Sequence, residues 1–141
     1  MIRLPSQVVD HLENAARHGW PYEVCGFLIG RSRQGFAEVV SMALSPNRAD
    51  DPASRFLLDP AMHLRLQREL RGSDFSILGV FHSHPGGEAA LSAADCESQA
   101  PGDWIWIVSA LDAKDGECRT RGFRLTRGGT AEEVELRVTE C

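Results

Sequence analysis

The strongest constraint on the fold is a near-continuous run of apolar residues at positions 75–81, with the sequence FSILGVF. A short apolar run of this kind, following the polar turn residues at 72–74, is typical of a strand that is buried on both of its faces. Such a strand needs other elements packed on both sides of its sheet. The run therefore predicts a sheet that is covered on both of its faces.

Helix signals precede and follow this run. Ser6 is placed to cap a helix that continues to about His18, with Leu12 and Ala16 on one face and Gly19 as the stop. Two more helices are predicted, one opening at Asp59-Pro60 and ended by Gly72, and a short one over residues 93–100.

The remaining segments have strand character, and they dominate the second half of the chain. We predict these further strands at residues 24–30, 36–44, 104–111, 118–126 and 134–138. Helices and strands alternate early in the chain, whereas strands follow one another late. This order predicts an α/β protein with a mixed sheet, folded as a single domain over residues 1–141.

Composition excludes several classes of function. Fifteen basic and twenty acidic residues give a net charge of -5, which argues against nucleic acid as the main partner. No apolar run approaches the roughly 18–20 residues that cross a bilayer, so no membrane partner is expected. The N-terminal residues turn polar by Ser6, which is unlike a signal peptide. We therefore expect a cytoplasmic location.

Four scattered cysteines fit this expectation. No two of them have the Cys-x-x-Cys spacing that is used in zinc knuckles or redox dithiols, since they stand at Cys25, Cys96, Cys118 and Cys141. In a chain without a secretion signal we interpret them as reduced thiols.

The residues that could bind a metal or take part in catalysis are concentrated just after the apolar run. His82 and His84 are two residues apart, and Ser92 and Asp95 follow in the pattern His-x-His-x7-Ser-x2-Asp. On an extended segment the two histidines point to the same side. If the strand ends at position 81 or 82, both emerge at its carboxyl end. Two imidazoles and one carboxylate, with a fourth position open for water, are typical of a catalytic zinc site.

A structural alternative accounts for part of this pattern. Ser-x-x-Asp before a helix is also a capping pair, in which Ser92 caps the helix and Asp95 lies near its positive end. The two interpretations are compatible, because a hydroxyl group can accept one hydrogen bond and donate another.

The pattern resembles the motif of the JAMM (MPN+) zinc metalloprotease family. The segment PYEVCGFLIG, which contains Glu23, looks like the family's upstream glutamate segment. The resemblance implies that His82, His84 and Asp95 bind one Zn²⁺ ion, that Glu23 is the general acid/base, and that Ser92 stabilises the oxyanion. It also implies a curved mixed sheet flanked by helices, similar to the fold of cytidine deaminases, although the deaminase motif itself is absent.

The resemblance further implies hydrolysis of peptide or isopeptide bonds next to a ubiquitin-like fold. For a short chain we expect the tail of a ubiquitin-like sulfur-carrier protein as substrate. A general small-peptide metallopeptidase and a non-catalytic MPN interaction module are the alternatives. The oligomeric state is left open.

Two expectations concern the surroundings of the site. We expect the loop at residues 45–55 and the turn at residues 85–90 to form a channel in which an extended tail pairs with an exposed sheet edge. Cys25, two residues after Glu23, is either near the metal or a small buried residue. The other histidines, His11, His18 and His63, are expected at the surface.

Overall fold

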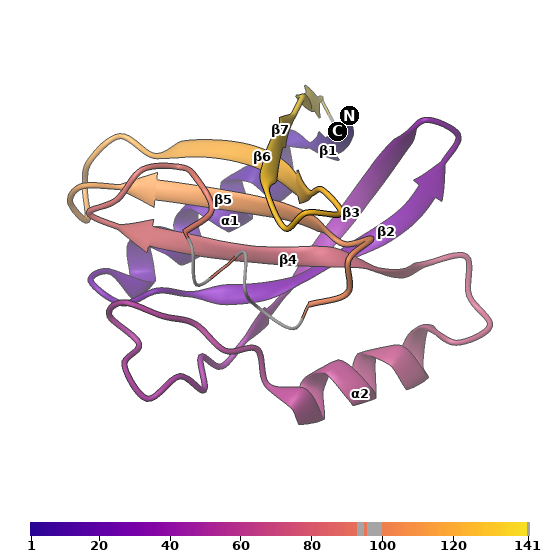
Figure 1. Ribbon diagram of the computed structural model, residues 1–141, viewed down its shortest axis with the longest axis horizontal. Helices are drawn as coiled ribbons and strands as arrows, with labels where there is room; N and C mark the ends of the chain where they lie inside the picture. Colours follow the sequence, from indigo (N-terminus) through magenta and orange to yellow (C-terminus); the bar gives the residue numbers. More distant parts are fainter. Residues whose placement is uncertain (93–94, 96–99, 141) are drawn as a thin grey trace.

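A computed structural model describes residues 1–92, 95 and 100–140 of the chain (Figure 1). Along the sequence the elements are β1 (Ile2–Pro5), α1 (Ser6–Gly19), β2 (Cys25–Arg33), β3 (Phe36–Ser45), α2 (Pro60–Leu70), β4 (Ser76–Pro85), β5 (Ile105–Leu111), β6 (Arg119–Leu125), β7 (Ala131–Val134) and β8 (Leu136–Thr139). The strands form one sheet in the order β7-β6-β5-β4-β2-β3-β1-β8. Both parallel and antiparallel pairs occur, so the predicted mixed sheet is confirmed.

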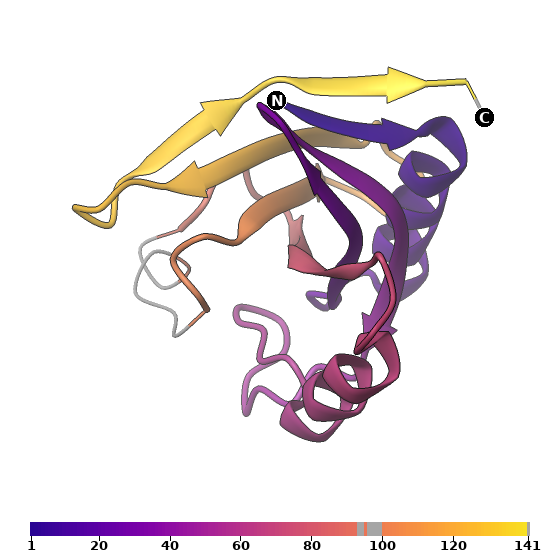
Figure 2. The same ribbon diagram turned by 90° about the vertical axis from the view of Figure 1, so that its right-hand side faces the viewer.

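The sheet curves until its two ends approach each other. Its outermost strands, β7 and β8, are separated in sequence by Glu135 alone. Figure 2 shows β7 and β8, in yellow, running one after the other along the top of the view. β7 pairs with β6 at one end of the sheet and β8 pairs with β1 at the other. The sequence predicted one strand at residues 134–138 and missed the four-residue β1, which pairs with β8.

Each face of the sheet has its own apolar core. On one face α1 packs with its buried side chains against the sheet, and the strands contribute Leu28, Phe81 and Ile107. On the other face Leu66 of α2 packs in a cluster with Phe27, Val80, Trp106 and Val108. The central strands are therefore covered on both sides, as the apolar run predicted.

β4 is longer than its apolar run and carries an irregularity. Its pairing with β2 skips Leu78, which is a β-bulge, because Leu28 faces Gly79 whereas Ile29 faces Ile77. After the bulge Val80 lies on the α2 face and Phe81 on the α1 face. β4 then continues to Pro85, so both histidines lie within the strand instead of beyond its end.

The signals for α1 and α2 were correct in position but not always in capping. Asp59 caps α2 by accepting a hydrogen bond from the Ala61 N–H at 3.2 Å, and Pro60 occupies the first helical position. Ser6, in contrast, is already helical, and its predicted capping role is wrong: the residue before α1 is Pro5, which has no side chain able to cap. The helix predicted at 93–100 falls largely outside the described residues. In the described part of the chain no helix has the length and apolarity needed to cross a membrane.

Candidate active site

The central strand β4 brings the two histidines together. His82 pairs with Cys25 of β2 and with Val108 of β5, and His84 pairs with Ala110 of β5. Their ring centroids lie 4.6 Å apart, which confirms that both side chains point to the same side. His82 is completely buried, whereas the side chain of His84 is partly exposed.

Asp95 reaches both rings with one oxygen. Its Oδ2 atom lies 3.4 Å from His82 Nε2 and 3.2 Å from His84 Nε2. The same atom accepts a hydrogen bond from the Ser92 backbone N–H at 2.8 Å, and Ser92 Oγ accepts one from the Asp95 N–H at 3.1 Å. These reciprocal bonds have the pattern of a capping box, as predicted for this pair, while most of the helix that Ser92 was predicted to cap lies outside the described residues. The box holds the Asp95 carboxylate against the histidines.

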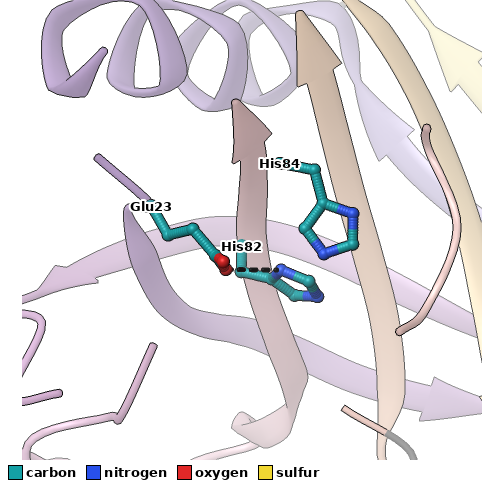
Figure 3. Close-up of side chains that lie close together, drawn as sticks. All are labelled: Glu23, His82 and His84. Atoms are coloured by element: carbon teal, nitrogen blue, oxygen red, sulfur yellow. Dashed lines mark ion pairs between the residues drawn. The ribbon is translucent and has the colours of Figure 1, made fainter. Parts of the chain in front are cut away.

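Glu23 approaches the same rings from the segment before β2. Its Oε1 atom lies 3.7 Å from His82 Nδ1, and the side chain is buried. Figure 3 shows the Glu23 carboxylate and the two imidazoles converging. Each of the three residues offers a ligand atom within 4.8 Å of the others, so the group could hold a metal ion.

The imidazole of His82 forms no hydrogen bond with the described residues. Both of its ring nitrogens are buried and lack a hydrogen-bond partner there. Its ring is stacked on Phe56 at a centroid distance of 4.5 Å and meets Trp106 edge-on. A buried donor or acceptor left without a partner costs about 1–3 kcal/mol, so this arrangement calls for a ligand at the imidazole.

His84 is oriented by the turn that follows β4. Its Nδ1 atom lies 2.9 Å from the Glu88 carbonyl oxygen, and Nδ1–H donation leaves Nε2 free to face Asp95 and His82. Burial lowers the pKa of His84. The bonds to Asp95 and the Glu88 carbonyl, and the charges of Asp95 and Glu23, outweigh that effect and raise this pKa above its usual value.

The pKa of Asp95 moves in the opposite direction. Burial raises it, but the hydrogen bond with His84, the charge of His82 and the bond from the Ser92 N–H together lower it below the usual value. The carboxylate is therefore ionised at neutral pH, as a metal ligand has to be.

A pocket of about 510 Å³ opens beside these residues. Ser92 and Asp95 lie on its wall, and Phe56, Trp104 and Trp106 are among its apolar lining residues. The loop predicted as one wall contributes Ser54 and Arg55, whereas the turn at residues 85–90 does not line this pocket. The expected open sheet edge is not found at the histidines, because β4 is paired with β2 on one side and β5 on the other.

The remaining cysteines and histidines have other environments. Pairing with His82 puts Cys25 on the same face of the sheet, but its Sγ atom contacts the Ser45 and Pro46 carbonyl oxygens at 3.9 Å. Burial raises the pKa of this thiol to about 12, and the charge of Glu23 adds to the effect. Cys25 and Cys118 are free thiols, while Cys96 and Cys141 lie outside the described residues.

One of the three other histidines is not the surface residue that the sequence predicted. The partly buried His63 ring packs at 5.3 Å from the rings of both Phe27 and Trp104, and it lines the pocket. His11 and His18 are exposed on α1, as expected.

Sequence reasoning missed two polar residues that hold Glu23 in place. Ser83 Oγ accepts a hydrogen bond from the Val24 N–H at 2.9 Å, which ties β4 to the residue after Glu23. The Asn47 side chain donates to the Glu23 carbonyl oxygen at 3.0 Å. Ser83 stood inside the His-x-His pattern and could have been noticed there. Nothing near Asn47 in the sequence points to Glu23.

Comparison with known proteins identifies the relatives of the chain. The family described as prokaryotic homologs of the JAB domain matches residues 5–124. A desampylase from Pyrococcus furiosus is 30% identical over 86 residues, which are 61% of this chain and 58% of the relative. A desampylase from Haloferax volcanii is 27% identical over 76% of each chain. The name desampylase denotes an enzyme, which supports the expectation of a hydrolase.

Solved structures show the same fold. A protein from Desulfitobacterium hafniense superimposes with a TM-score of 0.87 at 26% identity, covering 99% of this chain and 94% of the other. A JAB1/MPN domain protein from Archaeoglobus fulgidus superimposes with a TM-score of 0.62 at 19% identity, covering 98% and 99%. The second likeness shows the fold alone.

Proposed function

Because this chain belongs to the prokaryotic homologs of the JAB domain, we propose that it is a zinc-dependent hydrolase of peptide or isopeptide bonds. The observation that carries the proposal is the convergence of His82, His84 and Asp95 at the wall of a pocket, with Glu23 beside them. Relatives named desampylase support a substrate in which a ubiquitin-like protein is joined to another molecule.

The donor atoms fit zinc. Two atoms bound about 2.0–2.1 Å from one zinc ion at the tetrahedral angle lie about 3.3 Å apart. Asp95 Oδ2 lies 3.4 Å from His82 Nε2 and 3.2 Å from His84 Nε2, which agrees with that separation. Glu23 is farther away, at 3.7 Å from the other nitrogen of His82. We therefore assign His82, His84 and Asp95 as the ligands of one Zn²⁺ ion and leave Glu23 free.

A zinc ion held by these residues would supply a nucleophile at neutral pH, because zinc lowers the pKa of a bound water molecule to about 7. Glu23 would accept the proton of the attacking water and pass it to the departing amine, since an amide anion is too poor a leaving group. Ser92 is exposed on the pocket wall, and its Oγ already accepts from the Asp95 N–H. Its own hydroxyl proton can therefore be donated to the carbonyl oxygen as negative charge develops there.

For the substrate we propose the C-terminal tail of a ubiquitin-like sulfur-carrier protein. A Gly-Gly tail has almost no side chains to recognise, so binding depends on a narrow passage and on backbone contacts. The loop that contributes Ser54 and Arg55 lines the same pocket as Asp95 and would form one side of such a passage. The proposed location of the protein is the cytoplasm.

Zinc analysis tests the ligand assignment. The wild-type protein should hold one zinc ion per chain, and Asp95→Asn and His84→Ala should lose it. Full retention of zinc by both variants would show that the ion binds elsewhere.

Cleavage assays test the substrate. The substrate is a ubiquitin-like carrier extended past its Gly-Gly, compared with versions that have Ala or Val at the penultimate glycine. A narrow passage predicts a steep loss of turnover with Val. Equal cleavage of all three would favour a general peptidase, and no cleavage of any substrate by the zinc-loaded protein would favour a non-catalytic domain.

A further inference from the structure

The connection between β3 and α2 is organised around one side chain, Asn47. Its Nδ2 group donates to the carbonyl oxygens of Glu23 at 3.0 Å and Arg55 at 2.9 Å. Its Oδ1 atom accepts from the N–H groups of Ala49 and Leu57, each at 3.0 Å. A primary amide has two donor hydrogens and two acceptor lone pairs, so all four bonding positions of Asn47 are used. We refer to residues 47–57 as the Asn47 loop.

The Asn47 loop holds the backbone of Glu23 from both sides. The Glu23 N–H donates to the Pro52 carbonyl oxygen at 2.7 Å, and the Glu23 carbonyl oxygen accepts from Asn47. Glu23 lies two residues before β2 begins, so it is outside the strand ladder that holds Cys25 and the residues after it. The position of Glu23 therefore depends on this loop and on the neighbouring bonds between Val24 and Ser83.

The same loop also touches the histidines. Phe56 stacks on the ring of His82 with an interplanar angle of 20°. Asn47 bonds the residues on both sides of Phe56, through the Arg55 carbonyl and the Leu57 N–H. One amide group thus organises the segment that covers His82 and the segment that carries Glu23.

We infer that Asn47 is a positioning residue, which holds the Glu23 carboxylate beside His82, where it can accept the proton of the attacking water. The inference rests on the proposed function, since it assigns to Glu23 the transfer of a proton. An amide is needed at position 47 because both Nδ2 hydrogens point at carbonyl oxygens. An aspartate has the same shape but places a charged acceptor against those two oxygens, so it would push the loop away from Glu23.

The decisive variant is Asn47→Asp, and Asn14→Asp is its matched control. Asn14 is exposed on α1, so the control adds the same charge at a distance from the site. We expect Asn47→Asp to lower kcat for the extended carrier substrate about tenfold to a hundredfold, since misplacement of a reacting group by about 1 Å can cost that much. Asn14→Asp should stay within twofold of wild type, and all three proteins should hold the same amount of zinc.

A double-mutant cycle separates positioning from general support of the fold. If Asn47 acts through Glu23, the Asn47→Asp change should have almost no further effect on kcat in a Glu23→Gln background. An equal fold-loss in both backgrounds would overturn the inference, as would an unchanged kcat in the single variant.

Amide hydrogen exchange tests the same inference without any substrate. Asn47→Asp should speed the exchange of the Glu23 amide, because its acceptor, the Pro52 carbonyl, lies in the loop that the variant displaces, and should leave the amides of α1 unchanged. Unchanged protection of Glu23 would refute the positioning role even if the protein proved to hydrolyse nothing. If Asn47→Asp does not fold, Asn47→Ala removes the four bonds without adding charge, and the same two outcomes apply to it.

Discussion

The two faces of the sheet are used in different ways, although the same central strand contributes to both. On the α1 face β4 contributes Phe81, which is completely buried, and the helix covers the strands with an apolar stripe that includes Leu12. On the α2 face the next residue of the strand is His82. There α2 buries only Leu66, and a pocket of about 510 Å³ lies between the sheet and the Asn47 loop.

One face of the sheet therefore provides stability, and the other provides an accessible site. A helix laid along the sheet, as α1 is (Figure 2), buries its apolar side chains in a core with those of the strands. The Asn47 loop and α2 cover the other face incompletely, because a pocket remains there. Polar side chains can therefore approach one another on that face.

Shortening one buried side chain in each of the two helices should have unequal effects on the free energy of unfolding. Leu12→Ala removes a completely buried side chain from the α1 face and should lower the free energy of unfolding by about 2–5 kcal/mol. Leu66→Ala, beside a pocket into which neighbours can relax, should fall at the lower end of that range. Urea denaturation followed by circular dichroism measures both. A larger loss for Leu66→Ala would mean that α2 supports the fold more than α1 does.

Neutralising one glutamate on each face should separate chemistry from packing. Glu23→Gln should keep zinc but lose amide hydrolysis by about a hundredfold or more, which corresponds to about 2.7 kcal/mol. Glu13→Gln on α1, where Glu13 accepts a hydrogen bond from Thr120, should leave turnover within twofold. Steady-state kinetics and zinc analysis on the same samples measure both effects. Full activity of Glu23→Gln would move the proton-transfer role to another residue.

The Cys25 thiol should make stability depend on pH in the alkaline range. Burial, aided by the charge of Glu23, raises its pKa from 9.0 to about 12, so the native state holds the proton more tightly than the unfolded chain. The resulting stabilisation is fully present below pH 9. It is lost as pH rises toward 12, by about 1.4 kcal/mol per pH unit.

Denaturation of wild type and Cys25→Ala between pH 8 and pH 11 checks this prediction. The slope difference between the two proteins should appear above pH 9. Cys118→Ala provides the comparison on the α1 face, where the thiol is only partly buried and a weaker dependence is expected. Parallel curves for wild type and Cys25→Ala would contradict the assignment of the thiol as a buried neutral group.

The smallest effect is expected for the serine that caps the Asp95 turn. Ser92→Ala removes the acceptor of the Asp95 N–H and should lower the free energy of unfolding by about 1 kcal/mol, together with a loss of turnover. Ser6→Ala is the control, because Ser6 opens α1 without acting as its cap, and it should change stability by less than about 0.5 kcal/mol. Thermal denaturation of the two variants distinguishes these expectations. Equal shifts would mean that the Ser92 bond is not a stabilising cap.

Much of the fold and part of the site could be predicted because the signals are local in sequence. The buried strand follows from the apolar run at residues 75–81. The shared direction of His82 and His84 and the pairing of Ser92 with Asp95 follow from spacings of two and three residues. The family resemblance added Glu23, and the match to residues 5–124 shows that the family was correctly predicted. That one domain extends over residues 1–141, and that His82, His84 and Asp95 bind zinc with Glu23 and Ser92 as catalytic residues, stay predictions.

The features that the sequence did not predict are contacts between residues that are far apart in the chain. Strand pairing brings Glu23 to His82, and the Asn47 amide to Glu23. The closing of the sheet by β7 and β8 and the packing of His63 between Phe27 and Trp104 have the same origin. A sequence determines its local conformation through the geometry of neighbouring residues. The partner of a buried polar group depends on which distant segment packs against it, and only the folded chain determines that.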